Sequence, residues 1–322
     1  MHTFFLLSAL LLAAVVSSLG ALLLRQTPGQ GRRFLALVVL AAPLFALGLA
    51  VQHVVPRFWE DCAPLVGWDR LASMGLLAGL GGVALGALAL NVGRLVLVER
   101  LLRSCPLLES DPLLKRTRML AESLGLRGPA VRLLRVDAPL ALSGGLSQPT
   151  VVISQWFFQH LDATELDAVI SHELAHLARR DYLTRAAGRF LRDATVYLPG
   201  GWYALRVLEA DEELSADSLA VQVTARPLAL ASALGKVWHR AMASQRPAGL
   251  AGAPTFGGNS ATLLEQRLHR LLEEPRKSES AIRGRVVAGA AAVSVGEVVP
   301  RVLAASAAAL PLVCALPRGF GL

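Results

Sequence analysis

Residues 162–181 read DATELDAVISHELAHLARRD, the most informative stretch of the chain. Asp162, followed three residues later by Glu165, forms the pattern of a capping box, which predicts that a helix begins here. Apolar side chains recur at helical spacing after it, at Leu166, Val169, Ile170, Leu174 and Leu177. The stretch therefore predicts an amphipathic helix that buries one face in a core.

Two histidines on this helix, His172 and His176, stand four residues apart, about 40° around the axis at 3.6 residues per turn. Their imidazoles therefore converge on one ion, with Glu173 beside them. This HExxH arrangement offers two ring nitrogens to zinc and a carboxylate placed to take a proton from a water molecule. By itself the pattern also fits two surface histidines that flank a glutamate by chance.

Catalytic zinc takes three protein ligands, so a third is expected outside the helix. Residues 209–221 read EADEELSADSLAV, in which Glu213 and Asp217 lie four apart on an expected helix. Glu213 is placed to complete the site, and Asp217 to accept a hydrogen bond from a ligating histidine. From the residues alone, other acids compete with Glu213 as ligand, namely Glu209, Asp211 and Glu212. An acidic, solvated helix face is the alternative interpretation of the whole segment.

The composition departs from that of a soluble protein. Hydrophobic residues make up 54% of the 322 residues, charged residues only 17%, and the mean hydropathy is +0.50. Soluble domains contain about 45–50% apolar and about 25% charged residues. The excess excludes a disordered chain and argues against a purely soluble enzyme. Three cysteines without a CxxC pair exclude a disulfide framework and a cysteine zinc cluster.

The apolar residues are concentrated in blocks long enough to cross about 30 Å of hydrocarbon as helices. Three lie early in the chain, at 3–24, 34–55 and 71–93, and an alanine-rich fourth lies at about 286–316. The first block has a signal peptide as its alternative, and the last has a tail lying on the membrane. The 25–33 connection carries three arginines and no acid, so we expect it in the cytoplasm and the N-terminus outside.

Three stretches together resemble the M56 peptidases, membrane metalloproteases related to the β-lactam sensor-transducers. They read HELAHLARRDYL, YLPGGWYALRVLEADEELSADSLAV and LLEQRLHRLLEEP, and the likeness covers roughly residues 99–275. In this family a basic pair and an aspartate follow HExxH, matched here by Arg179, Arg180 and Asp181. An ExxxD element then supplies the third ligand, which falls on Glu213 with Asp217.

The resemblance implies a Zn2+ site with assigned roles. His172, His176 and Glu213 are the expected metal ligands, and Glu173 is the expected catalytic base. Asp217 and Asp181 are expected to contact the ligating residues and not to bind the ion themselves.

Two departures from the M56 pattern bear on function. Only six residues, PRGFGL, follow the last apolar stretch, so we expect no penicillin-binding sensor domain and no direct β-lactam sensing from this chain. Ala216 stands where M56 members often have cysteine, which makes the element similar also to the M48 heat-shock membrane proteases. The M48 proteases place two membrane spans between HExxH and the glutamate that binds the metal. Residues 184–208 of this chain carry five charged side chains, so no membrane span fits between the two motifs. M56 is therefore the preferred resemblance.

The expected fold is a mainly α membrane protein with three to four transmembrane helices and an α+β, zincin-like metalloprotease domain. Residues 1–98 are expected to form three transmembrane helices with short loops, 99–285 a cytoplasmic zinc metalloprotease domain, and 286–322 a fourth transmembrane helix with a short tail. The 99–285 segment has 24 basic and 20 acidic residues and no basic stripe. The net charge of +8 therefore gives no reason to expect direct nucleic-acid binding.

The expected function is that of a membrane-embedded, zinc-dependent endopeptidase that hydrolyses peptide bonds of a cytoplasmic protein. By family analogy the substrate is a transcriptional repressor cleaved in signal transduction, and the location is the bacterial inner membrane, with the lipid bilayer as the other partner. Two alternatives are an M48-like protease for membrane-protein quality control and a non-catalytic membrane signalling scaffold. The retention of Glu173 argues against the scaffold.

The run Pro149–Ser154, PTVVIS, has two interpretations of equal weight. It is either an edge strand that pairs with an extended substrate or an ordinary core strand. The residue that helps stabilise the oxyanion is open among Tyr182, Tyr197, Tyr203, His239 and His269.

Overall fold

A computed structural model describes residues 2–27, 32–57, 67–146, 148–243 and 258–273 of the chain. These residues form two compact units, each described here by itself. The helical unit contains residues 2–91 and 187–208, and the sheet unit contains residues 92–186 and 209–273. Residues 187–208, which the sequence interpretation includes in the 99–285 domain, thus cluster with the N-terminal helices.

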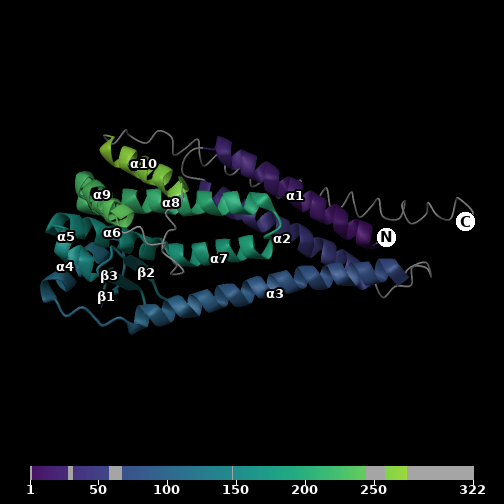
Figure 1. Cartoon of the computed structure of the whole chain (residues 1–322), viewed down its shortest axis with the longest axis horizontal. Helices are drawn as coiled ribbons and strands as arrows, with labels where there is room; N and C mark the ends of the chain where they lie inside the picture. The colour runs from purple at the N-terminus through teal and green to yellow at the C-terminus, as the bar shows by residue number, and fades with distance from the viewer. Residues whose placement is uncertain (1, 28–31, 58–66, 147, 244–257, 274–322) are drawn as a thin grey trace, which may run out of the picture. The chain divides into compact units, whose positions relative to one another are not determined.

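The helical unit is built from long apolar helices. They are α1 (His2–Gln26), α2 (Arg32–Arg57) and the first part of α3 (Gly67–Ser104). The unit also contains the end of α7 (Asp181–Ala194) and the start of α8 (Pro199–Thr224). Helices α1 and α2 pack side by side (Figure 1). A buried cluster joins Leu24 of α1 and Leu40 of α2 to Leu208 of α8.

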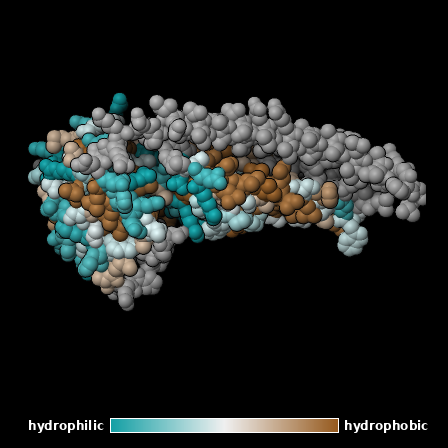
Figure 2. All heavy atoms as spheres, turned by 90° about the horizontal axis from the view of Figure 1, so that it is seen from above, coloured by the Kyte–Doolittle hydropathy of each residue, from teal (hydrophilic) through white to brown (hydrophobic). Residues whose placement is uncertain are grey.

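Two helices in the described part of the chain are long and apolar enough to cross a membrane. They cover Leu6–Gln26 and Gly67–Ser104, with mean hydropathies of 2.4 and 1.8. Large apolar side chains stand exposed along both, including Phe4 and Leu11 on α1 and Leu85 on α3. On the face that Figure 2 shows, hydrophobic side chains gather over the N-terminal helices and hydrophilic side chains over the sheet unit. The expected span at 286–316 lies outside the described residues.

Gly200 allows α8 to approach α1 closely. A Cβ at this position would lie 2.2 Å from the backbone oxygen of Ser17 and 2.3 Å from its Oγ. A backbone atom cannot relieve such a clash by a rotamer change, as the end of a side chain can. Any larger residue at position 200 must therefore push the two helices apart. Small residues serve the same purpose where helices pack closely in membranes.

Replacing Gly200 by alanine is therefore expected to lower the free energy of unfolding by about 1–3 kcal/mol through overpacking. The thermal unfolding midpoint of the detergent-solubilised full chain measures the effect. Gly79→Ala is the matched control, because a Cβ at Gly79 meets nothing within 4 Å. Equal midpoints for the two variants would contradict the close contact.

The sheet unit contains three strands, β1 (Ala130–Leu134), β2 (Ala141–Gly144) and β3 (Thr150–Ser154). The strand order is β1-β3-β2, with β1 parallel and β2 antiparallel to β3. The PTVVIS strand is therefore central, and its interpretation as an edge strand is wrong. All five residues of β3 are buried, which is the reason for its apolar, β-branched sequence.

Helices gather around these strands (Figure 1). They are α4 (Asp111–Ser123), α5 (Gln155–His160), α6 (Ala163–Arg179), α9 (Pro227–Ala243) and α10 (Gly258–Leu272), with the remainders of α3, α7 and α8. The architecture is thus mainly helical with one small sheet, as expected for the α+β part.

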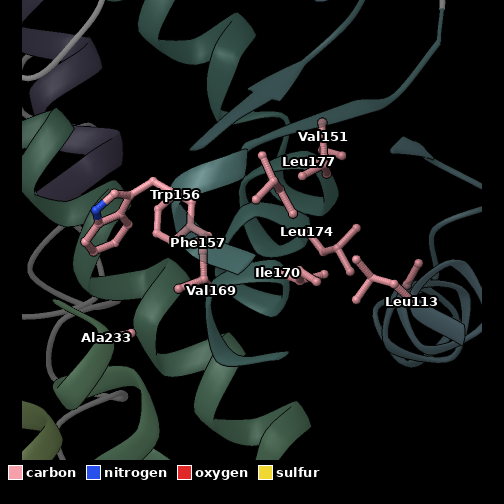
Figure 3. Close-up of a cluster of buried hydrophobic side chains, with 11 residues drawn as sticks. Leu113, Val151, Trp156, Phe157, Val169, Ile170, Leu174, Leu177 and Ala233 are labelled. Carbon is pink, nitrogen blue, oxygen red and sulfur yellow. The ribbon is translucent and has the colours of Figure 1, made fainter. Parts of the chain in front are cut away.

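The main core of the sheet unit lies between β3 and α6. Figure 3 shows Ile170, Leu174 and Leu177 of α6 with Val151 of β3 and Leu113 of α4. Ile170 and Leu174 have no exposed surface. The predicted amphipathic helix is therefore confirmed, and its apolar stripe faces this core.

The start of α6 is fixed by a buried glutamate. Asp162 accepts hydrogen bonds from the backbone of Thr164 and Glu165, and Glu165 Oε2 accepts one from the backbone of Asp162, so the predicted capping box is confirmed. Glu165 also accepts hydrogen bonds from Lys236 Nζ and Ser232 Oγ of α9, both at 2.6 Å. One carboxylate thus caps α6 and ties it to α9.

The stability that Glu165 contributes is expected to depend on pH. Burial raises the pKa of Glu165, but the hydrogen bonds from Lys236, Ser232 and the Asp162 backbone outweigh it and hold the pKa below its usual value of 4.5. The contribution is therefore present above pH 4.5 and is lost as the pH falls through the lower, folded-state pKa.

Glu165→Gln should unfold more easily than wild type at pH 7, by about 1–3 kcal/mol. The difference should narrow as the pH falls below 4.5. Thermal midpoints of the full chain between pH 7 and 3 measure both effects. Glu122→Gln, on the exposed side of α4, is the control. A difference that stays constant with pH would contradict the ion pair with Lys236.

Candidate metal centre

The core packing of α6 decides where its histidines point. His172 and His176 each follow a core residue by two positions, Ile170 and Leu174, which is about 200° around a helix. His172 therefore leaves α6 on the side opposite Ile170, and His176 on the side opposite Leu174. His172 is only 8% exposed and the side chain of His176 12%, so both rings are covered. The alternative of two surface histidines is thus excluded.

Three side chains converge next to this face. The Nε2 atoms of His172 and His176 lie 3.2 Å apart. Glu213 of α8 places Oε2 3.4 Å from His172 Nε2 and Oε1 3.6 Å from His176 Nε2. All three ligand atoms lie within 4.8 Å of one another. Two imidazole nitrogens and a carboxylate are one of the ligand sets of catalytic zinc, so the residues present are able to hold a metal ion.

Asp181 orients His176. It accepts a hydrogen bond of 2.8 Å from Nδ1, which directs Nε2 at the shared point. The backbone makes this possible, because Arg180 ends α6 in the left-handed conformation, at φ 54° and ψ 38°. The turn brings the first residue of α7 back beside the last turn of α6, where Arg179 also contacts Asp181.

Asp217 lies beside His172 in the same way. Its Oδ1 is 2.9 Å from His172 Nδ1, an ion-pair distance. Asp217 is only 4% exposed, and its charge is balanced by Arg267 of α10, whose Nε and Nη2 lie 2.7 and 2.8 Å from the two carboxylate oxygens. Each histidine therefore has its own carboxylate on the ring nitrogen that faces away from the centre.

Among the four acids of residues 209–213, Glu213 is the one that reaches the Nε2 atoms of both histidines. The group of converging ligand atoms contains it, and not Glu209, Asp211 or Glu212. Glu212 is fully buried and pairs with Arg185 Nε at 3.0 Å, so its carboxylate is used elsewhere. Glu213 itself contacts two guanidinium groups, Arg185 at 3.3 Å and Arg267 at 3.1 Å.

These contacts shift the pKa values of the metal-free site in opposite directions. Burial lowers the pKa of His172, but Asp217 and Glu213 outweigh it and raise the pKa to about 9. Burial raises the pKa of Glu213, but His172, Arg267 and His176 hold it well below its usual value. The acids around His172 thus favour the charged imidazole, and the cations around Glu213 favour the charged carboxylate.

Glu173 stands apart from this network. Among the described residues no hydrogen-bond donor engages its carboxylate, and its charge acts on Arg267 only through space. It is nevertheless adjacent to His172 and nearly buried. A free, buried carboxylate beside the ligands is the arrangement that a proton acceptor requires.

Comparison with known proteins identifies the family. Residues 60–228, just over half of the chain, match the family described as BlaR1 peptidase M56. The chain belongs to the M56 metallopeptidase family. The preferred resemblance of the sequence is therefore confirmed.

Members of a second group are more distantly similar to this M56 chain. A protease HtpX homolog of Acaryochloris marina is 27% identical over 229 residues, 58% of the chain and 77% of the relative. A protease HtpX homolog of Halobacterium salinarum is 33% identical over 76 residues, and protease HtpX homolog 2 of Methanosarcina mazei is 28% identical over 143. The chain spans only 26% and 49% of these last two relatives.

Two arginines of the centre were not assigned to it from the sequence. Arg185 enters the sequence argument only as one of the five charged side chains of residues 184–208. A signal for Arg267 was present, because it lies four residues from both Leu263 and Leu271, in the apolar stripe of its helix. Of the oxyanion candidates, His269 is exposed and pairs with Glu273, and Tyr203 packs under Arg25.

Proposed function

We propose that this M56 chain is a membrane-embedded, zinc-dependent endopeptidase that hydrolyses peptide bonds of a cytoplasmic protein. The observation that carries the proposal is the convergence of His172, His176 and Glu213 beside the buried carboxylate of Glu173, which has no hydrogen-bond donor among the residues that the structure describes. A purely structural metal site has no use for a buried, unengaged carboxylate next to its ligands.

In this proposal His172, His176 and Glu213 hold the Zn2+ ion. When bound, zinc acidifies a water molecule and polarises the scissile carbonyl group. Glu173 takes the proton of the attacking water and later delivers it to the leaving amine. Asp181 and Asp217 keep the histidines oriented and increase their basicity.

The edge strand β2 is the proposed binding strand for an extended substrate. The outer edge of β1 is already paired with residues 106–108, through hydrogen bonds to Leu133 and Val131. Strand β2 packs against α6 and pairs with β3 on one side. Ser154 N donates to Leu140 O, so by the alternation of antiparallel pairing Ala141 and Ser143 direct their backbone groups to the other side.

The membrane arrangement is part of the proposal. We infer three to four spans, including the two candidate helices, with residues 99–285 in the cytoplasm and the N-terminus outside. The arginines of the 25–33 connection support this orientation. The proposed location is the bacterial inner membrane, and the proposed role is signal transduction by cleavage of a transcriptional repressor.

Quality control of membrane proteins is a second candidate function. It is favoured by the similarity to proteins named protease HtpX homologs. Both functions share the same chemistry and differ in substrate. Persistence of one soluble repressor in a deletion strain, without accumulation of misfolded membrane proteins, supports the first, and the reverse pattern supports the second.

Membrane vesicles of known orientation test the activity and its sidedness together. Inside-out vesicles from cells that express the chain are expected to cleave an added unfolded protein, and sealed right-side-out vesicles are not. A zinc chelator should stop the cleavage, and added Zn2+ should restore it. Cleavage that is indifferent to chelation would overturn the zinc mechanism, and cleavage only by right-side-out vesicles would invert the topology.

A further inference from the structure

Arg267 connects two of the three proposed metal ligands. Its Nε and Nη2 form a fork on the carboxylate of Asp217, at 2.7 and 2.8 Å, and Asp217 contacts His172. Its Nη1 lies 3.1 Å from Oε2 of Glu213. One guanidinium group therefore touches Glu213 directly and reaches His172 through Asp217.

Two sets of contacts hold Arg267 in place, one at its guanidinium group and one along its helix. Only 12% of it is exposed, and its charge faces Asp217, Glu213 and, farther away, Glu173. One turn later on α10, Leu271 packs against Ala168 of α6, Ala220 of α8 and Leu230 of α9. The position of the guanidinium is thus fixed by the helices that carry HExxH and Glu213.

We propose that Arg267 is a positioning residue of the metal centre, which fixes the carboxylate of Glu213 and, through Asp217, the ring of His172. The inference rests on the proposed metal site. Arg267 lies outside residues 60–228, the part of the chain that matches the family, and 50 residues after Asp217.

Arginine is required for this role rather than any cation. The fork on Asp217 uses two parallel N–H groups of a planar guanidinium, and a third N–H remains for Glu213. A lysine ammonium is a point charge on a flexible stem and cannot hold both carboxylates at these angles. Arg267→Lys therefore keeps the charge but loses the geometry.

The opposite role is that of a competitor, a cation that takes the position of the metal ion and leaves when the metal binds. The geometry favours positioning, because two of the three contacts go to Asp217, whose Oδ1 lies at His172 Nδ1 rather than at the converging Nε2 atoms. The two roles predict opposite changes in metal affinity when Arg267 is replaced. Loss of a positioning residue weakens metal binding, whereas loss of a competitor strengthens it.

The test is the Zn2+ affinity of the full chain in detergent, measured by competition with a chromophoric chelator. Arg267→Lys is expected to lower the affinity about 10–100-fold, the usual effect of losing a partner of a metal ligand. The visible spectrum of the Co2+-loaded protein should also change, since it reports ligand geometry independently of catalysis. Arg270→Lys, on the exposed side of the same helix, should match wild type in both.

A double variant separates positioning from a general structural effect. If Arg267 acts through Asp217, Arg267→Lys combined with Asp217→Asn should weaken Zn2+ binding little more than the worse single change. Additive losses of Zn2+ affinity would show that Arg267 does not act through Asp217. An affinity of Arg267→Lys within twofold of wild type, or a tighter one, would overturn the proposal while the zinc site itself stands. Wild-type protein that fails to bind Zn2+ would instead overturn the proposed function.

Discussion

Replacing Glu173 by glutamine is expected to reduce peptide hydrolysis about 10²–10⁴-fold while the zinc content of the protein stays unchanged. Glutamine has nearly the same size as glutamate but cannot accept the proton of the attacking water. Because Glu173 does not contact the converging ligand atoms, the metal should be held as in wild type.

The measurement is the initial rate of cleavage of a quenched fluorescent protein substrate, with zinc stoichiometry determined on the same samples. Glu122→Gln is the control, because Glu122 is exposed on α4 and should leave both quantities unchanged. A Glu173→Gln protein that cleaves at the wild-type rate would remove Glu173 from the mechanism. Parallel loss of zinc and activity would instead assign it a role in metal binding.

Glu213→Ala is expected to abolish both zinc retention and cleavage. It removes the only carboxylate that lies within reach of both histidine Nε2 atoms in the described part of the chain. Loss of a direct ligand should exceed the 10–100-fold loss typical of its outer partners, so we expect the affinity to fall by more than about 100-fold.

The metal-free Glu213→Ala protein should still fold. Arg185 keeps its contact with Glu212, and Arg267 keeps its fork on Asp217, so neither guanidinium is left unpaired. The thermal midpoint of the chelator-treated protein checks this. Glu209→Gln, one turn earlier on α8, is the matched control and should retain zinc. Full zinc content in Glu213→Ala together with its loss in Glu209→Gln would move the third ligand to Glu209.

The sequence predicted the α6 helix well. The capping box of Asp162 and Glu165, the apolar stripe and the histidine spacing are all interactions within four residues, and local geometry fully specifies them. The sequence also predicted the N-terminal apolar helices, because each is a continuous run that needs no partner to be recognised.

The sequence does not distinguish between residues of the same chemical type, and the tertiary structure was needed to choose among them. Glu209, Asp211, Glu212 and Glu213 are equally acidic, and only the packing of α8 against α6 shows that Glu213 meets the histidines. In the same way, PTVVIS reads as either an edge or a central strand until its neighbours β1 and β2 are known.

The sequence by itself therefore determined the HExxH helix, the membrane-protein class and the family. The tertiary structure decided which acid joins the histidines, that β3 is central, that residues 187–208 cluster with the N-terminal helices, and that Arg267 reaches the centre. The physical reason is the range of the interactions. Periodicity and capping act within one or two helical turns, whereas Arg267 and Asp217 meet across 50 residues of chain and only after α10 has packed on the domain.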